Sequence, residues 1–167
     1  MILREHTYEM TAELGRIIAL DTGDARIGIA LSDPLGIIAS PAGHISAIPP
    51  EAAMRELMQI IREKEVKAVV IGLPRLIGGE EGEQARKARA FAETFRGILP
   101  TEIPIYFEDE RFTTAMAGQV TQKKRRANRR KGEKDAIAAA HILRTFLDRP
   151  VPSRQEYVPV QKEKTDI

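Results

Sequence analysis

The stretch Arg16-Ile-Ile-Ala-Leu-Asp-Thr-Gly-Asp-Ala-Arg-Ile-Gly-Ile-Ala-Leu-Ser32 decides the fold. It holds two almost continuously apolar runs, Arg16 to Thr22 and Arg26 to Ser32, each as long as a buried β-strand. The residues between them, Asp-Thr-Gly-Asp, are typical of a tight turn. The stretch therefore predicts a β-hairpin whose first strand ends in an acidic residue, Asp21.

Downstream of this hairpin, helical and strand patterns alternate. The predicted elements are a weaker strand over Ile37 to Ile45, a helix over Glu51 to Lys64, a buried strand over Lys67 to Leu73, a helix over Glu83 to Arg96, a strand over Ile103 to Phe107, a short helix capped by Thr113 or Thr114, and a last helix over Asp135 to Leu147. A hairpin followed by strand–helix–strand crossovers predicts a mixed sheet. The expected fold is an α/β domain of three layers, with helices on both faces of the sheet.

The length and composition bound the organisation of the chain. A chain of 167 residues is long enough for one domain with a sizeable core, expected over residues 16–148 after an N-terminal extension, 1–15. Pro150, Pro152 and many charges from Arg149 onward predict a mobile C-terminal tail, 149–167. No apolar run reaches membrane-spanning length, and no secretory signal opens the chain. The absence of cysteine excludes disulfides and thiolate catalysis and suits a cytoplasmic protein.

Acidic residues stand at three places where buried elements begin or end. Asp21 closes one strand, Asp109 and Glu110 follow another, and Asp135 opens the last helix. Each has an ordinary explanation, as a turn residue, a surface charge or a helix cap. Ligands of such sheets, however, bind beyond the carboxyl ends of parallel strands, where Gly72 would leave room between the acids. Clustered carboxylates repel one another unless a cation joins them, and Mg²⁺ or Mn²⁺ prefers oxygen ligands.

Positive charge is concentrated in one segment. The residues from Lys123 to Lys134 hold eight cations and one acid, whereas the whole chain carries only +2, so the rest is net acidic. Such a segment favours nucleic acid as partner, and the alternative is a solvated loop of charges. The candidate phosphate contacts are Arg26, Arg75, Arg111, Lys123, Lys124, Arg125, Arg126, Arg129, Arg130 and Lys131. Acids that could hold divalent ions beside cations that could hold phosphate point to a nuclease.

Several of these stretches together resemble the YqgF family, also called RuvX. They are Leu20-Asp-Thr-Gly23, Arg26-Ile-Gly-Ile-Ala-Leu-Ser-Asp-Pro34, Val70-Ile-Gly-Leu-Pro-Arg75, Gly78-Gly-Glu-Glu-Gly82, Asp109-Glu-Arg-Phe-Thr-Thr114 and Lys134-Asp-Ala-Ile-Ala-Ala139. Members of this family are described as Holliday junction resolvases and as pre-16S rRNA nucleases. The resemblance implies an RNase H-like fold with strand order 3-2-1-4-5. It also implies Asp21, Glu110 and Asp135 as the catalytic, metal-binding acids, with Asp109 as the alternative to Glu110.

One departure concerns the fourth strand. In the wider RNase H superfamily this strand often ends in the second acid, whereas here Ile71-Gly-Leu-Pro-Arg75 carries no carboxylate. The number of metal ions therefore stays open. Leu20-Asp-Thr-Gly23 also occurs in retroviral-type aspartic proteases, but their all-β chains do not match the helices expected here. Actin-like ATPases share the turn, yet their nucleotide lies between two domains.

The expected function is that of a cytoplasmic, divalent-metal-dependent nuclease. Its expected partner is nucleic acid, as precursor 16S rRNA, branched DNA or single-stranded DNA, and no membrane is expected. A non-catalytic nucleic-acid-binding factor in ribosome assembly is the alternative. The sequence leaves open whether RNA or DNA is cut and whether the chain is a monomer or a homodimer.

Overall fold

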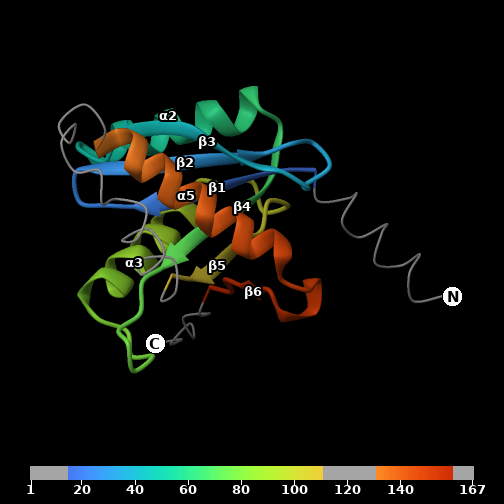
Figure 1. Ribbon diagram of the computed structural model, residues 1–167. Coiled ribbons are helices and arrows are strands. Elements are labelled where there is room, and N and C mark those ends of the chain that lie inside the picture. The colour runs from blue at the N-terminus through green and yellow to red at the C-terminus, as the bar shows by residue number, and fades with distance from the viewer. Residues whose placement is uncertain (1–14, 111–130, 160–167) are drawn as a thin grey trace, which may run out of the picture.

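The computed structural model describes residues 15–110 and 131–159. Within these ranges a six-stranded mixed sheet is flanked by helices (Figure 1). The elements are β1 (Arg16–Thr22), β2 (Arg26–Ser32), β3 (Ala39–Ser46), α2 (Pro50–Glu63), β4 (Val66–Leu73), α3 (Glu83–Arg96), β5 (Ile105–Asp109), α5 (Lys131–Asp148), the 3-10 helix η2 (Val151–Ser153) and β6 (Gln155–Glu156). No helix in these parts of the chain is long and apolar enough to cross a membrane.

The sheet has the order β3-β2-β1-β4-β5-β6. The predicted hairpin lies at its centre, with β1 antiparallel to β2 and parallel to β4. Strand β5 is parallel to β4, so β1, β4 and β5 all end at the same edge of the sheet. The predicted order 3-2-1-4-5 is confirmed, and β6 extends it by pairing antiparallel with β5.

The two faces of the sheet carry separate apolar cores. Ile18 and Leu20 of β1 belong to the core covered by α2 and α3, whereas Ile17 and Ala19 belong to the core under α5. Figure 1 shows α5 lying across the strands. Because side chains alternate along a strand, Asp21 continues the row of Ile17 and Ala19 and faces α5.

Two glycines let α5 approach the sheet closely. A Cβ atom added at Gly28 of β2 would overlap the backbone carbonyl of Asp135. One added at Gly132, near the start of α5, would overlap the ring of His44 on β3. These contacts press the first turns of α5 against the hairpin side of the sheet and fix the height of Asp135 above it.

The structure corrects the predicted start of the last helix. Asp135 does not open α5, because the helix is already formed at Lys131, the first described residue after the gap at 111–130. Lysine and glutamate favour helix, and Gly132 finds packing against His44 that offsets its low propensity. The short helix predicted at Thr113 or Thr114 lies outside the described residues.

Residues 149–159 differ from the mobile tail predicted for them. Arg149 forms a paired hydrogen bond with the buried Glu108 of β5, at 2.5 and 3.1 Å. The short strand β6 then adds to the sheet, and the Tyr157 ring packs edge-on against Phe107, with 5.7 Å between ring centroids. Residues 160–167 lie outside the described part of the chain.

Candidate active site

Asp21 and Glu110 meet above β4 at the carboxyl edge of the sheet. Leu20 pairs with Ile71, which brings Asp21 level with Gly72 of the neighbouring strand. Glu110 directly follows β5, and its backbone N–H donates a hydrogen bond of 3.2 Å to the carbonyl of Leu73. A Cβ atom at Gly72 would overlap Oε1 of Glu110, so the carboxyl group occupies the space that the missing side chain leaves. Gly72 therefore leaves room for the two acids, as the sequence indicated, and they come into direct contact, although two strand spacings between their backbones predicted a gap too wide for that.

The two carboxyl groups share a hydrogen bond and hold a proton between them. Burial raises the pKa of Glu110 to about 8, and the charge of Asp21 and the hydrogen bond between them act in the same direction. Burial also raises the pKa of Asp21 to about 6, helped by the negative charge of Asp135 and opposed by the hydrogen bond from Glu110. Near neutral pH the proton belongs to Glu110, which donates to the Asp21 carboxylate.

Asp135 lies beside this pair but contacts a different partner. The Nε–H of Arg26, the first residue of β2, donates a 2.7 Å hydrogen bond to Oδ2 of Asp135. The effect of Asp135 on the pKa of Asp21 shows that its charge still reaches the pair. The fold thus gathers all three predicted catalytic acids on the α5 side of the sheet.

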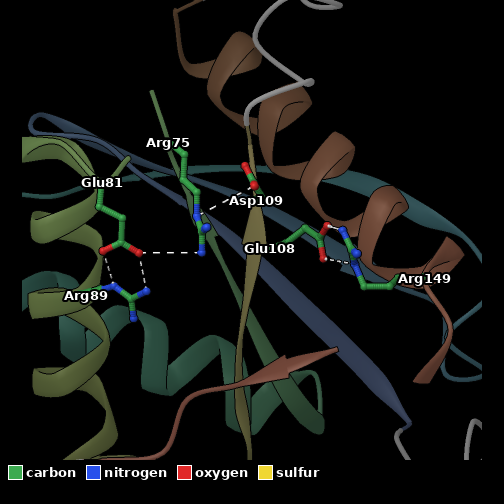
Figure 2. A network of polar contacts seen from close by, with 6 residues as sticks. All are labelled: Arg75, Glu81, Arg89, Glu108, Asp109 and Arg149. Carbon is green, nitrogen blue, oxygen red and sulfur yellow. Dashed lines mark hydrogen bonds and ion pairs between the residues drawn. The ribbon is translucent and has the colours of Figure 1, made fainter. Parts of the chain in front are cut away.

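Asp109 faces the opposite side of the sheet from Glu110. Its carboxylate lies 3.9 Å from Nε of Arg75, and another nitrogen of the same guanidinium lies 3.9 Å from Glu81 (Figure 2). Glu81 in turn accepts two hydrogen bonds from Arg89, at 2.5 and 2.8 Å. The structure therefore brings Glu110, rather than Asp109, against Asp21, and gives Asp109 to the network that ties the β4–α3 loop to α3.

The donor set fits a hard divalent cation in its chemistry. Two buried carboxyl groups in direct contact, one of them forced to keep its proton, are an arrangement that a cation would relieve. Over residues 15–110 and 131–159, however, no three acidic or histidine side chains converge closely enough to ligate one ion. Asp21 and Glu110 lie together and could both offer oxygen atoms to an ion, whereas Asp135 is held by Arg26.

The predicted phosphate contacts are only partly described. Arg26 and Arg75 both lie at the carboxyl edge of the sheet, and Lys131 begins the described part of α5. The remaining candidates, Arg111, Lys123, Lys124, Arg125, Arg126, Arg129 and Arg130, lie outside the described residues.

Sequence reasoning missed two ionic contacts near the site. Glu108 is a buried acid of β5, and it forms an ion pair with Arg149, 41 residues away (Figure 2). Arg26 and Asp135 are 109 residues apart. No local pattern indicates either pair, although the alternation of β5 places Glu108 on the face that α5 covers.

Comparison with known proteins agrees with this geometry. Residues 15–149 match the family model described as RuvX, Holliday junction resolvase. The chain belongs to the RuvX family. A relative from Roseiflexus sp. (strain RS-1), described as "Putative pre-16S rRNA nuclease", is 41% identical over 140 residues, which cover 83% of this chain and 98% of the relative. A second RuvX relative of the same description, from Sulfurihydrogenibium sp. (strain YO3AOP1), is 39% identical over 136 residues, covering 81% and 92%.

The fold of this RuvX chain also occurs in a solved resolvase. The structure described as T. thermophilus RuvC in complex with Holliday junction substrate aligns with a TM-score of 0.50 at 12% identity, covering 86% of this chain and 99% of that one. At this identity the likeness shows the fold alone, a mixed RNase H-like sheet.

Proposed function

We propose that this RuvX chain is a divalent-metal-dependent nuclease that hydrolyses phosphodiester bonds. The observation that carries the proposal is the contact between Asp21 and Glu110 across Gly72 at the carboxyl edge of the sheet. Two buried carboxyl groups this close cannot readily ionise together, and a purely structural role does not require such a pair. Their position, beside Asp135 and the cations of Arg26 and Arg75, supports a hydrolytic site for an anionic polymer.

The acids would hold Mg²⁺ or Mn²⁺ through Asp21 and Glu110, with Asp135 as the third ligand. A bound divalent ion supplies activation of water and stabilisation of the charge that develops on the phosphate. The chain's own residues prepare the site. Gly72 removes the side chain that would separate the acids, and burial keeps water from screening their charges. Glu110 would release its shared proton when a cation takes its place.

Two arginines at the carboxyl edge of the sheet, Arg26 and Arg75, would orient the nucleic acid. Arg26 stands on the hairpin side of the acid pair, and Arg75 stands on the α3 side, where Asp109 and Glu81 hold it. A guanidinium binds a phosphate with the same fork geometry that it offers to a carboxylate. The basic segment that precedes α5 would follow the backbone further along, and such contacts carry no base information.

The proposed substrate is the 5′ end of precursor 16S rRNA. The descriptions of both relatives support this choice, since each is aligned over nearly its whole length with this chain. A four-way DNA junction is the second candidate, because the matching family model is described as a Holliday junction resolvase. A junction resolvase would need two copies of the site to cut symmetrically.

The test compares wild type with Asp21→Asn on matched substrates. Precursor 16S rRNA fragments, single-stranded DNA and a four-way junction would each be incubated with Mg²⁺, Mn²⁺ or EDTA. We expect metal-dependent cleavage by wild type and a loss of at least about 100-fold in Asp21→Asn, roughly the effect of removing a single strong catalytic interaction. Circular dichroism and thermal unfolding of the variant would show that its fold is intact.

Each outcome separates the candidate functions. A preference for the rRNA 5′ end supports RNA processing, and a preference for the junction supports resolution. Cleavage by pure Asp21→Asn at the wild-type rate would disprove the catalytic role of this acid. Binding of nucleic acid without cleavage in any metal would favour the non-catalytic assembly factor.

A further inference from the structure

The hydrogen bond between Arg26 and Asp135 joins two groups that the proposed chemistry needs for other purposes. Arg26 is a candidate phosphate contact, and Asp135 is the candidate third metal ligand. Their side chains remain 35% and 29% exposed, although the bond between them is only 2.7 Å long. Both partners are therefore within reach of an ion or a phosphate that arrives from solvent.

The backbone of Asp135 has little freedom to move. Its carbonyl lies where a side chain at Gly28 would otherwise stand, and about one turn earlier Gly132 packs against the His44 ring. A change in the partner of Asp135 must therefore come from rotation of its side chain, which moves between discrete rotamers.

The Asp21–Glu110 pair, which Asp135 could join as a third metal ligand, lies close to Asp135. The negative charge of Asp135 already acts on Asp21, yet its carboxylate is turned toward Arg26. In the parts of the chain that the structure describes, no three acids converge on one point. The Arg26 guanidinium is thus the counter-ion of the Asp135 carboxylate, the group that would complete the acid cluster.

We propose that Arg26 is a positioning residue that holds Asp135 away from the Asp21–Glu110 pair until a substrate phosphate engages the guanidinium. The inference rests on the nuclease function proposed above. Phosphate and carboxylate compete for the same donor fork, so a phosphate at Arg26 frees Asp135. Nucleic-acid binding and divalent-metal binding are then coupled, and each strengthens the other by the same factor.

The first test measures Mn²⁺ binding in the absence of nucleic acid. Isothermal titration calorimetry would compare wild type, Arg26→Gln, Arg26→Lys and Lys87→Gln. Arg26→Gln frees Asp135 and is expected to bind Mn²⁺ about tenfold more tightly than wild type, within the usual range of coupling between two sites. Arg26→Lys keeps a cation beside Asp135 and is expected to stay near wild type.

Lys87→Gln is the matched control. Lys87 forms an ion pair of 3.0 Å with Asp24, which belongs to the turn between β1 and β2. The substitution removes the same unit of charge from a neighbouring surface pair without touching Asp135. It should leave Mn²⁺ affinity unchanged, so that any effect in Arg26→Gln cannot come from net charge alone.

The second test adds the substrate. A phosphorothioate-protected RNA, which resists cleavage, should tighten Mn²⁺ binding by wild type and have less effect on Arg26→Gln. Thermal unfolding in EDTA and in Mn²⁺ would establish that each variant is folded and would give an independent measure of metal binding.

The outcomes distinguish this inference from the nuclease proposal. If folded Arg26→Gln binds Mn²⁺ no more tightly than wild type and Lys87→Gln, the coupling is wrong, even where cleavage persists. If Arg26→Gln fails to fold, the wild type alone still tests the coupling. A wild-type Mn²⁺ affinity that does not change when the protected RNA is added would overturn it. Tighter Mn²⁺ binding by Arg26→Gln with no cleavage of any nucleic acid would support the role of Arg26 and contradict the nuclease.

Discussion

The proton shared by Asp21 and Glu110 links the stability of the protein to pH. The folded pKa of Glu110, about 8, lies above its ordinary value of 4.5, so the folded state keeps a proton that the unfolded state releases between these values. Stability is therefore greatest below the unfolded pKa and is lost as pH rises toward the folded one. The isosteric change Glu110→Gln removes this loss.

We expect Glu110→Gln in EDTA to be more stable than wild type near pH 8, by on the order of 1 kcal/mol. Urea unfolding at several pH values would measure the difference, which should shrink toward pH 4–5 (about the unfolded pKa). Glu102→Gln, at an exposed acid in the turn before β5, is the control and should keep the wild-type pH dependence. A wild type more stable than Glu110→Gln at every pH would contradict the shared proton.

At the scale of secondary structure, the position of Asp135 depends on how closely α5 approaches β2. In Gly28→Ala the added methyl group would overlap the Asp135 carbonyl, so α5 must shift outward. We expect the free energy of unfolding to fall by about 1–3 kcal/mol, as in other overpacked cores. Mn²⁺ affinity and cleavage should fall as well, because Asp135 is carried away from the acid pair. Chemical unfolding and Mn²⁺ titration would measure the two effects.

Gly78→Ala is the matched control for this change. Gly78 lies in the β4–α3 loop, and a Cβ atom there would meet no other atom within 4 Å. Restricting the unfolded chain makes such a substitution neutral or slightly stabilising. If Gly28→Ala behaves like Gly78→Ala in both measurements, α5 is not positioned by its contact with β2.

For the molecule as a whole, local patterns predicted the sheet and long-range contacts completed it. The apolar runs of β1, β2 and β4 each indicate a buried strand. Their order in the sheet was implied by the resemblance to the RuvX family, not by the runs themselves. Strand β6 has only two residues, and its place depends on Arg149 reaching Glu108 and on Tyr157 reaching Phe107. A pattern of prolines and charges contains no signal for such contacts.

The candidate site shows the same division between local and distant information. The positions of Asp21 and Glu110 follow from strand ends, and the gap at Gly72 is visible in the sequence. Which partner Asp135 takes is decided by Arg26, 109 residues earlier, and by the close packing at Gly28. Tertiary packing, rather than helix capping, therefore determines the surroundings of Asp135.

The charge distribution predicts how the whole molecule binds nucleic acid. The sheet edge is acidic, so attraction for a polyanion must come largely from the segment between Lys123 and Lys134, whose net charge is +7 in a chain of net +2. Replacing Lys123, Lys124, Arg125 and Arg126 by Gln should weaken binding and flatten its salt dependence. For every phosphate that is no longer neutralised, the slope of log affinity against log salt should decrease by about 0.7–0.9.

A control with equal charge change separates local binding from net charge. Arg62, Lys64, Lys67 and Arg144 are exposed. The first three lie at the end of α2 and the start of β4, the end of that strand opposite to Gly72, and Arg144 lies in the second half of α5. Their replacement by Gln should leave the salt slope near wild type, as measured by fluorescence anisotropy of labelled RNA over a series of KCl concentrations. Equal slopes for the two quadruple variants would mean that affinity follows net charge alone, and the basic segment would then have no direct contact with the backbone.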